Sequence, residues 1–162
     1  MGSYDVAQIC LNGHVITDRA RRAPERMQKF CKNCGEPTIT DCPNCKTLIR
    51  GHYQVEGVIT VSGHGPTAPS FCHECGKAYP WTEQKLEAAW ELADELEELS
   101  DEEKEKLKQN LKDLVRDTPK TELATTRVKK ILSKVGKESF AAMKSILLDL
   151  ATEAAKKALF GA

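Results

Sequence analysis

The stretch FCKNCGEPTITDCPNCKTLIRG, residues 30–51, holds four cysteines in two CxxC pairs, Cys31/Cys34 and Cys42/Cys45. A CxxC turn lets two sulfur atoms converge on one metal ion, and a glycine or polar residue after the second cysteine relieves the crowded backbone. Gly35 stands in that place after the first pair. The stretch therefore predicts two metal-binding turns in a small β module that metal stabilises.

The rest of the sequence supplies a matching number of ligands. A third CxxC pair lies at residues 72–75, and the segment CLNGH at residues 10–14 adds one cysteine and one histidine. Structural zinc is tetrahedral and takes four nitrogen or sulfur ligands, so these groups fill two sites with no cysteine left over. We therefore expect two structural Zn²⁺ ions per chain. The predicted ligands are Cys10, His14, Cys31, Cys34, Cys42, Cys45, Cys72 and Cys75.

Two pairings of these ligands are compatible with the sequence. Sequential pairing places the first four ligands on one ion and the last four on the other, which makes two zinc ribbons in tandem. A cross-braced arrangement, as in RING domains, would instead join the first ligand pair with the third and the second with the fourth. RING sequences usually keep only a few residues between their middle pairs, whereas seven separate Cys34 from Cys42 here. The spacing favours the tandem arrangement and leaves the cross-brace as the alternative.

The cysteine count argues against other thiol chemistry. All seven cysteines and all four histidines precede residue 76, and an odd number of thiols cannot pair completely into disulfides. The sequence shows no secretory signal pattern and no apolar run long enough to cross a membrane, so we expect a cytoplasmic protein. A thiol-redox protein would need one reactive CxxC at a helix N-terminus, whereas these pairs lie on predicted turns.

Short strands are predicted around the metal-binding turns. Residues 15–17 begin one strand and Phe30 ends another, while HYQV (52–55) and VITV (58–61) predict a β-hairpin. The YPWT segment, residues 79–82, is expected to seal the second ribbon against the first helix. Because both sites would be filled by protein ligands and a catalytic metal needs an open position, no enzyme activity is expected at the metals.

The insert between His14 and Cys31 is rich in basic residues that could contact nucleic acid or an acidic protein. Residues 1–81 carry nine Lys/Arg and seven Asp/Glu, a formal +2, which two Zn²⁺ (+4) and seven thiolates (−7) would lower to −1. A strong nucleic-acid binder should be basic as a domain, so a solvated loop is the competing interpretation. The candidate residues are Arg19, Arg21, Arg22, Arg26 and Lys29.

Composition and periodicity change after Trp81. Residues 82–162 contain neither cysteine nor histidine, and their apolar residues recur at helical spacing, which predicts about four amphipathic helices. Thr82 is the predicted N-cap of the first helix, and Ser100 with Glu103 forms a capping box for the second. The third helix is expected to end near Gly136, and the fourth to continue to Leu159.

Charge is distributed unevenly over this helical region. Residues 82–117 hold thirteen Asp/Glu against six Lys/Arg, whereas residues 118–162 hold four against nine. The opposite charges favour packing of the second part on the first, within one chain or between copies. The last helix combines Lys144, Lys156 and Lys157 with an apolar face, so peripheral membrane contact is an alternative to self-association or partner docking.

The motifs ICLNGHVI, FCKNCG, CPNCKTLIRG and FCHECGKAYPW resemble an uncharacterised family of bacterial proteins in which tandem zinc ribbons precede a helical region. The resemblance covers residues 8–81 and implies the same eight zinc ligands by position. It implies no catalytic activity.

These observations predict a non-enzymatic, zinc-binding adaptor or interaction protein. Residues 1–81 would form a tandem zinc-ribbon head, and residues 82–162 a helical region for self-association, as a homo-oligomer, or for docking a protein partner. Two alternatives remain open: a nucleic-acid-binding regulator that uses the Arg19–Lys29 loop, and a membrane-active or defence-type effector that uses the C-terminal helix.

Overall fold

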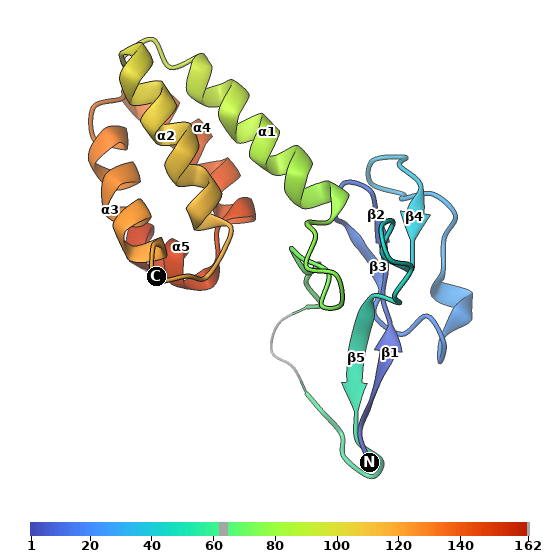
Figure 1. Ribbon diagram of the computed structural model, residues 1–162. Helices are drawn as coiled ribbons and strands as arrows, with labels where there is room; N and C mark the ends of the chain where they lie inside the picture. The colour runs from blue at the N-terminus through green and yellow to red at the C-terminus, as the bar shows by residue number, and fades with distance from the viewer. Residues whose placement is uncertain (62–64, 162) are drawn as a thin grey trace. The chain divides into compact units, whose positions relative to one another are not determined.

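The N-terminal part of the protein forms two small antiparallel sheets. In the computed structural model, which describes residues 1–61 and 65–161, β1 pairs with β5, and β2 lies between β3 and β4 (Figure 1). The strands are β1 (Ser3–Val6), β2 (Gln8–Cys10), β3 (Val15–Thr17), β4 (Thr38–Ile39) and β5 (Arg50–Gln54). In the β1–β5 pair Tyr4 lies opposite Tyr53. Of the predicted metal ligands, Cys10 lies in β2 and His14 directly precedes β3.

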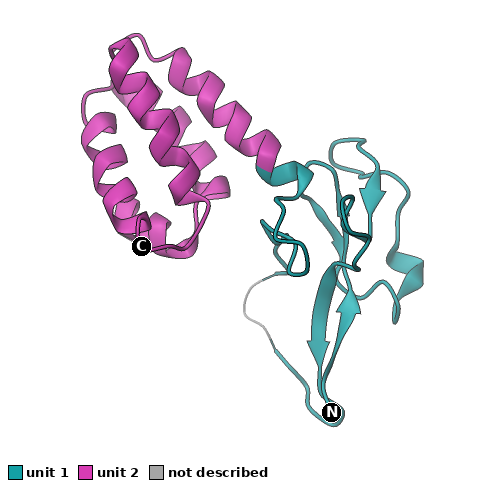
Figure 2. Cartoon of the chain, in the orientation of Figure 1, with its two compact units in different colours: residues 1–82 teal, residues 83–162 magenta. Residues whose placement is uncertain are grey.

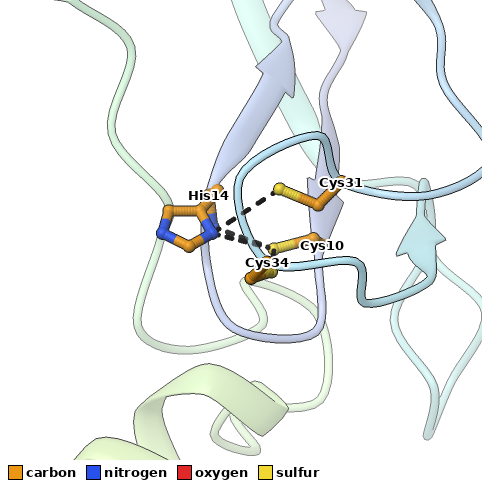
Figure 3. A group of neighbouring side chains, drawn as sticks. All are labelled: Cys10, His14, Cys31 and Cys34. Atoms are coloured by element: carbon orange, nitrogen blue, oxygen red, sulfur yellow. Dashed lines mark hydrogen bonds between the residues drawn. The ribbon is translucent and has the colours of Figure 1, made fainter.

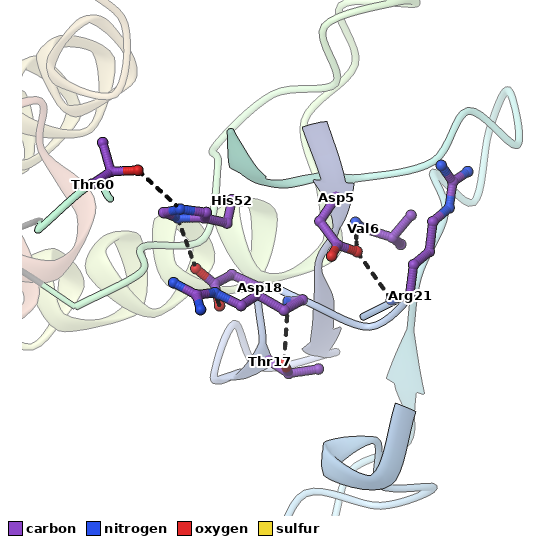
Figure 4. Close-up of polar contacts among 8 residues, drawn as sticks. Asp5, Val6, Thr17, Asp18, Arg21, His52 and Thr60 are labelled. Carbon is purple, nitrogen blue, oxygen red and sulfur yellow. Dashed lines mark hydrogen bonds and ion pairs between the residues drawn. The ribbon is translucent and has the colours of Figure 1, made fainter. Parts of the chain in front are cut away.

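The β1–β5 pair is fixed to the segment that follows β3 by close backbone contacts. The N–H of His52 donates to the carbonyl oxygen of Asp18 at 2.8 Å, and the N–H of Ala20 donates to that of Val6 at 2.9 Å. A Cβ added to Gly51 would lie 2.1 Å from the Asp18 oxygen, so only glycine permits this approach. The side chains add to it, because His52 Nδ1 lies 3.8 Å from the Asp18 carboxylate (Figure 4).

The predicted hairpin between residues 52–55 and 58–61 is wrong. The strand forms, but it pairs with β1 about fifty residues earlier, and residues 55–61 are not a strand. One edge of β5 is bonded to β1, and the other is approached by Asp18, which accepts the hydrogen bond from His52. No edge is left for the VITV segment, and Ile59 and Val61 stay 91% and 89% exposed.

One of the two remaining strand predictions is confirmed, because residues 15–17 form β3. Phe30 does not end a strand; it forms only an isolated antiparallel bridge with Pro37. The basic insert between them contains one turn of 3-10 helix, η1 (Pro24–Arg26). The insert is therefore a loop with a single helical turn.

The chain divides into two compact units, Met1–Thr82 and Glu83–Ala162 (Figure 2). The core of the first unit is centred on two aromatic rings, Tyr79 and Trp81, which stack with centroids 4.6 Å apart. The Trp81 indole N–H donates to the carbonyl oxygen of Pro69 at 2.8 Å. The buried residues of this core are Ala7, Ile9, Cys42, Ile49, Cys72, Tyr79 and Trp81.

Five helices follow the sheets. They are α1 (Pro80–Asp94), α2 (Asp101–Leu114), α3 (Thr121–Leu132), α4 (Lys137–Leu150) and α5 (Glu153–Phe160). The combination of a small β module with a helical region is confirmed. The last predicted helix is, however, divided in two at Ala151 and Thr152, where the backbone is extended and the Thr152 hydroxyl accepts a hydrogen bond from the Ala155 N–H.

Of the two predicted helix N-caps, one is confirmed and the other is wrong. The Ser100–Glu103 capping box of α2 is confirmed, with both reciprocal hydrogen bonds present. Thr82 is not the N-cap of α1, because the helix begins two residues earlier at Pro80. Proline suits the first turn of a helix, where its missing N–H costs nothing. The Thr82 hydroxyl instead donates to the carbonyl oxygen of Ser70 at 2.9 Å.

The apolar faces of the helices are buried on one another. Each of the five helices contributes fully buried side chains: Ala89 and Ala93, Leu107, Leu111 and Leu114, Val128, Met143 and Leu147, and Ala155. The acidic and basic segments also meet inside the helical unit. Glu103 forms an ion pair with Lys134, and the Glu98 carboxylate accepts hydrogen bonds of 3.0 Å from the Gly136 N–H and the Ser139 hydroxyl. Among the described residues, no helix has the length and apolarity needed to cross a membrane.

Candidate metal centre

The first cluster joins a strand turn to a CxxC turn. Cys10 ends β2 and His14 precedes β3, while Cys31 and Cys34 lie in the turn closed by the Phe30–Pro37 bridge. Cys10 Sγ lies 3.4 Å from His14 Nδ1 and 3.7 Å from Cys34 Sγ. Cys31 Sγ lies 3.6 Å from the same histidine nitrogen. The four side chains therefore converge on one point (Figure 3).

The second cluster joins two CxxC turns. An Asp41–Leu48 bridge closes one turn, and a Phe71–Ala78 bridge closes the other. Across the two turns, the Sγ atoms of Cys42 and Cys75 lie 3.8 Å apart, and those of Cys45 and Cys72 lie 3.6 Å apart. This cluster is made only of sulfur ligands.

The separations between the ligand atoms fit tetrahedral zinc. Zn–S bonds of about 2.3 Å and Zn–N bonds of about 2.0–2.1 Å, at tetrahedral angles, place two sulfurs about 3.8 Å apart and a sulfur and a nitrogen about 3.6 Å apart. The observed S···S distances are 3.6–3.8 Å and the S···N distances 3.4–3.6 Å. A disulfide would require about 2.05 Å. Each group could thus hold one metal ion.

The ligands are grouped in sequential order. Cys10, His14, Cys31 and Cys34 form one group, and Cys42, Cys45, Cys72 and Cys75 the other, with all four ligand atoms of each group within 4.8 Å of one another. The tandem arrangement is the one present, and the cross-braced alternative is not.

The three CxxC turns share one backbone design. In each, the residue after the second cysteine has a positive φ and donates its N–H to the carbonyl oxygen of the first cysteine. This residue is Gly35 (φ 77°), Lys46 (φ 64°) or Gly76 (φ 71°), with hydrogen bonds of 2.8–2.9 Å. Glycine adopts this conformation without strain, whereas Lys46 is the one non-glycine residue with positive φ in the described chain. The turn conformation is therefore the same in all three CxxC segments and does not require glycine at this position.

Backbone N–H groups favour the thiolate form that binds metal. The N–H groups of Cys75 and Glu74 point at the Cys72 sulfur and lower the pKa of this thiol to about 6. Burial opposes ionisation of Cys31, but the N–H groups of Asn33 and Cys34 outweigh it and lower the pKa of Cys31 to about 7. Each cluster thus contains a thiol that is predisposed to lose its proton.

The two clusters differ in burial. Cys42 and Cys72 are each 2% exposed and belong to the core that contains Tyr79 and Trp81. In the first cluster His14 and Cys34 are exposed. Both clusters contain two buried cysteines, and they differ in the other two ligands, which are exposed in the first cluster and half-buried in the second.

Trp81 connects the two clusters, which the sequence did not reveal. Its ring belongs to the core around Cys42 and Cys72. A Cβ added to Gly13, in the Cys10–His14 turn, would lie only 2.9 Å from the Trp81 Cβ. The YPW motif signalled an aromatic seal on the second ribbon. The motif did not indicate that the Trp81 side chain also lies against the first ribbon, because that contact joins residues far apart in the sequence.

The predicted basic residues lie in several different surroundings. Arg21 and Arg22 line a small cavity of about 100 Å³ beside Tyr4 and Asp5, and Figure 4 shows that the Arg21 backbone, not its guanidinium, is bonded to Asp5. The Arg19 guanidinium lies 3.9 Å from the Asp18 carboxylate. Of the remaining two, Arg26 ends η1, and Lys29 lies over the Phe30 ring.

A family model described as "Uncharacterized protein conserved in bacteria (DUF2321)" matches residues 3–159. The match covers the ribbons and the helices, so it extends beyond the motifs at residues 8–81 and confirms the resemblance to a bacterial family. No curated protein and no solved structure matches the chain.

Proposed function

We propose that this chain, which belongs to the DUF2321 family of bacterial proteins, is a non-enzymatic interaction protein whose N-terminal unit is held rigid by two structural Zn²⁺ ions. The observation that carries the proposal is the complete ligand set of each cluster, with four protein atoms at the separations of tetrahedral zinc. A catalytic zinc keeps one position open for water or substrate. Four protein ligands at each ion would leave no such position.

Zinc would serve folding here. The first unit has only about 80 residues, and its core consists of a few short strands around two aromatic rings and two cysteines. Domains of this size bury little apolar surface, whereas zinc binding to ribbon-like sites contributes on the order of 10 kcal/mol or more. Metal binding would therefore supply a large part of the folding free energy of this unit.

A surface for a protein partner lies at the free end of the β1–β5 pair. Tyr4 and Tyr53 are each 47% exposed, with ring centroids 4.8 Å apart, and the Arg50 guanidinium lies 4.7 Å from the Tyr4 centroid. Tyrosine and arginine are among the residues enriched at the energetic centres of protein interfaces, because they offer a large contact area and hydrogen bonds together. Ile59 and Val61 add exposed apolar area on the segment that follows β5.

Native mass spectrometry of the full chain tests the zinc part of this proposal. We expect two zinc ions per chain and their loss on treatment with a strong chelator, with retention of the helical circular dichroism. Fewer than two equivalents in carefully purified protein, or X-ray absorption spectra showing an oxygen ligand at zinc, would contradict it.

The partner surface requires its own experiment. In crosslinking from the native bacterial cell, the Tyr4→Ala/Tyr53→Ala double variant should lose adducts formed by the wild-type protein. Leu123→Ala is a matched control, because Leu123 is 50% exposed on α3 in the other unit. Equal adduct patterns for both variants would refute a role for the tyrosine pair.

Nucleic-acid binding by the basic insert is a second candidate. The exposed side chains of Arg21 and Arg22 have no carboxylate within ion-pair distance among the described residues, which leaves them free for phosphate. Binding should weaken steeply with salt. No binding to mixed-sequence RNA or DNA at about 50 mM salt would dismiss this candidate.

A further inference from the structure

We propose that the helical unit carries a binding site for a small organic phosphate in the pocket between α2 and α3. The pocket has a volume of about 530 Å³, within the usual size range of small-molecule sites. Four of its lining residues are cationic: Lys106, Arg127, Lys130 and Lys134. The site lies entirely within the second unit and is independent of the metal clusters.

Helix geometry places three of the pocket's cations on the same side of α3. Arg127, Lys130 and Lys134 are spaced by three and four residues, which aligns them along one side of α3 and its C-terminal extension. Lys106 joins them from α2, which packs against α3. Like charges at this spacing repel one another. A bound anion would relieve that repulsion.

Carboxylates of the protein do not neutralise the pocket. Glu103 is the one acidic residue among those lining it, and its carboxylate is already paired with Lys134. Within the described part of the chain, no carboxylate lies within ion-pair distance of Lys106, Arg127 or Lys130. Three positive charges therefore remain uncompensated.

This local charge contrasts with the unit around it. Residues 83–162 carry seventeen Asp/Glu and fifteen Lys/Arg, a formal −2. A long polyanion such as nucleic acid, or an anionic membrane, would also contact parts of this unit outside the pocket, and the unit as a whole is net negative. A compact anion that fits inside the pocket meets chiefly the cations. The charge pattern therefore favours a small soluble ligand.

The chemistry of the lining residues favours phosphate on an organic carrier. Arginine presents a planar fork that matches phosphate oxygens, and lysine adds point charges. The lining also includes Ile131 and Asn110, which are 8% and 6% exposed. An apolar contact and an amide beside three cations suit a ligand with at least two negative charges and a small uncharged body.

The test is an NMR titration of the full-length, zinc-loaded protein with fructose 1,6-bisphosphate at low ionic strength. Saturable shifts are expected for backbone amides of residues 103–110 and 127–134, and fructose should produce none. Arg127→Gln and Lys130→Gln should each weaken binding about tenfold, as expected from the loss of one charge-assisted hydrogen bond. Both side chains are exposed, so these variants should fold.

Lys137→Gln is the matched control, because it removes the same charge from an exposed position of the same unit that does not line the pocket. It should change the affinity less than about twofold, as expected for an unpaired surface charge. Equal weakening by all three variants would overturn the proposal. So would the lack of saturable shifts with both fructose 1,6-bisphosphate and inorganic phosphate, or binding only to phosphatidylglycerol vesicles.

Discussion

Replacing Gly51 by alanine should destabilise the first unit strongly, because the space for a side chain is occupied by backbone. An alanine Cβ would lie 2.1 Å from the Asp18 carbonyl oxygen and 2.8 Å from the Val6 carbonyl carbon. Backbone atoms cannot rotate away as a side chain could. To reach an ordinary contact of about 3.4 Å, β5 and the Asp18 segment must separate by more than 1 Å.

The size of the effect follows from what this separation breaks. It removes the 2.8 Å hydrogen bond from the His52 N–H to Asp18, worth about 1 kcal/mol. Strain from overpacking adds about 1–3 kcal/mol. We therefore expect the free energy of unfolding to fall by about 2–4 kcal/mol. Gly65→Ala is the control, because a Cβ there meets no atom within 4 Å and the change should be close to zero.

The measurement is urea unfolding at fixed free zinc, followed by Trp81 fluorescence in a Trp90→Phe background. Trp81 is buried in the core of the first unit, so its emission reports on that unit. A Gly51→Ala variant within about 0.5 kcal/mol of the parent, the range of ordinary surface substitutions, would refute the close backbone approach described above.

Three further predictions concern the two clusters and the helices. Cys72→Ser should reduce bound zinc from two ions to one and expose Trp81 to solvent. Cys34→Ser should also lose one ion but leave Trp81 buried. Zinc analysis and Trp81 fluorescence measure the two effects, and identical emission spectra for the two variants would contradict the difference in burial between Cys72 and Cys34. Ser100→Ala removes the capping box of α2 and should cost the helical unit about 1 kcal/mol, measured by thermal unfolding. Hydrogen bonds, first from the Gly136 N–H, lower the pKa of Glu98 below its ordinary value of 4.5, so its contribution is present at neutral pH and is lost as the pH falls through the lowered pKa. Glu98→Gln should flatten this acid dependence, and an unchanged pH profile would show that Glu98 does not contribute.

The metal ligands were predictable because their signal is local. A CxxC turn brings two sulfurs together within four residues, so counting ligands by spacing identified both groups that the structure brings together. The sequential grouping of the ligands was also favoured by spacing, namely the seven residues between Cys34 and Cys42. Neither inference required knowledge of how distant strands meet.

One error arose where distant segments compete, and another where a local signal was hidden. VITV has a high β propensity, but the edge of β5 that it would need is approached by Asp18, a contact that no local pattern records. The division between α4 and α5 had a readable signal, since Thr152 followed by Glu153 is typical of a helix start. The continuous apolar pattern of residues 140–159, without glycine or proline, hid it.

The order of the ligands along the chain has a consequence for biosynthesis. The first cluster is complete once Cys34 has left the ribosome, whereas the second must wait for Cys75 and the core for Trp81. At translation rates of about 5–20 residues per second, the interval between the two clusters is about 2–8 s. During this interval Cys42 and Cys45 are already synthesised, whereas the two thiols that complete their cluster are not.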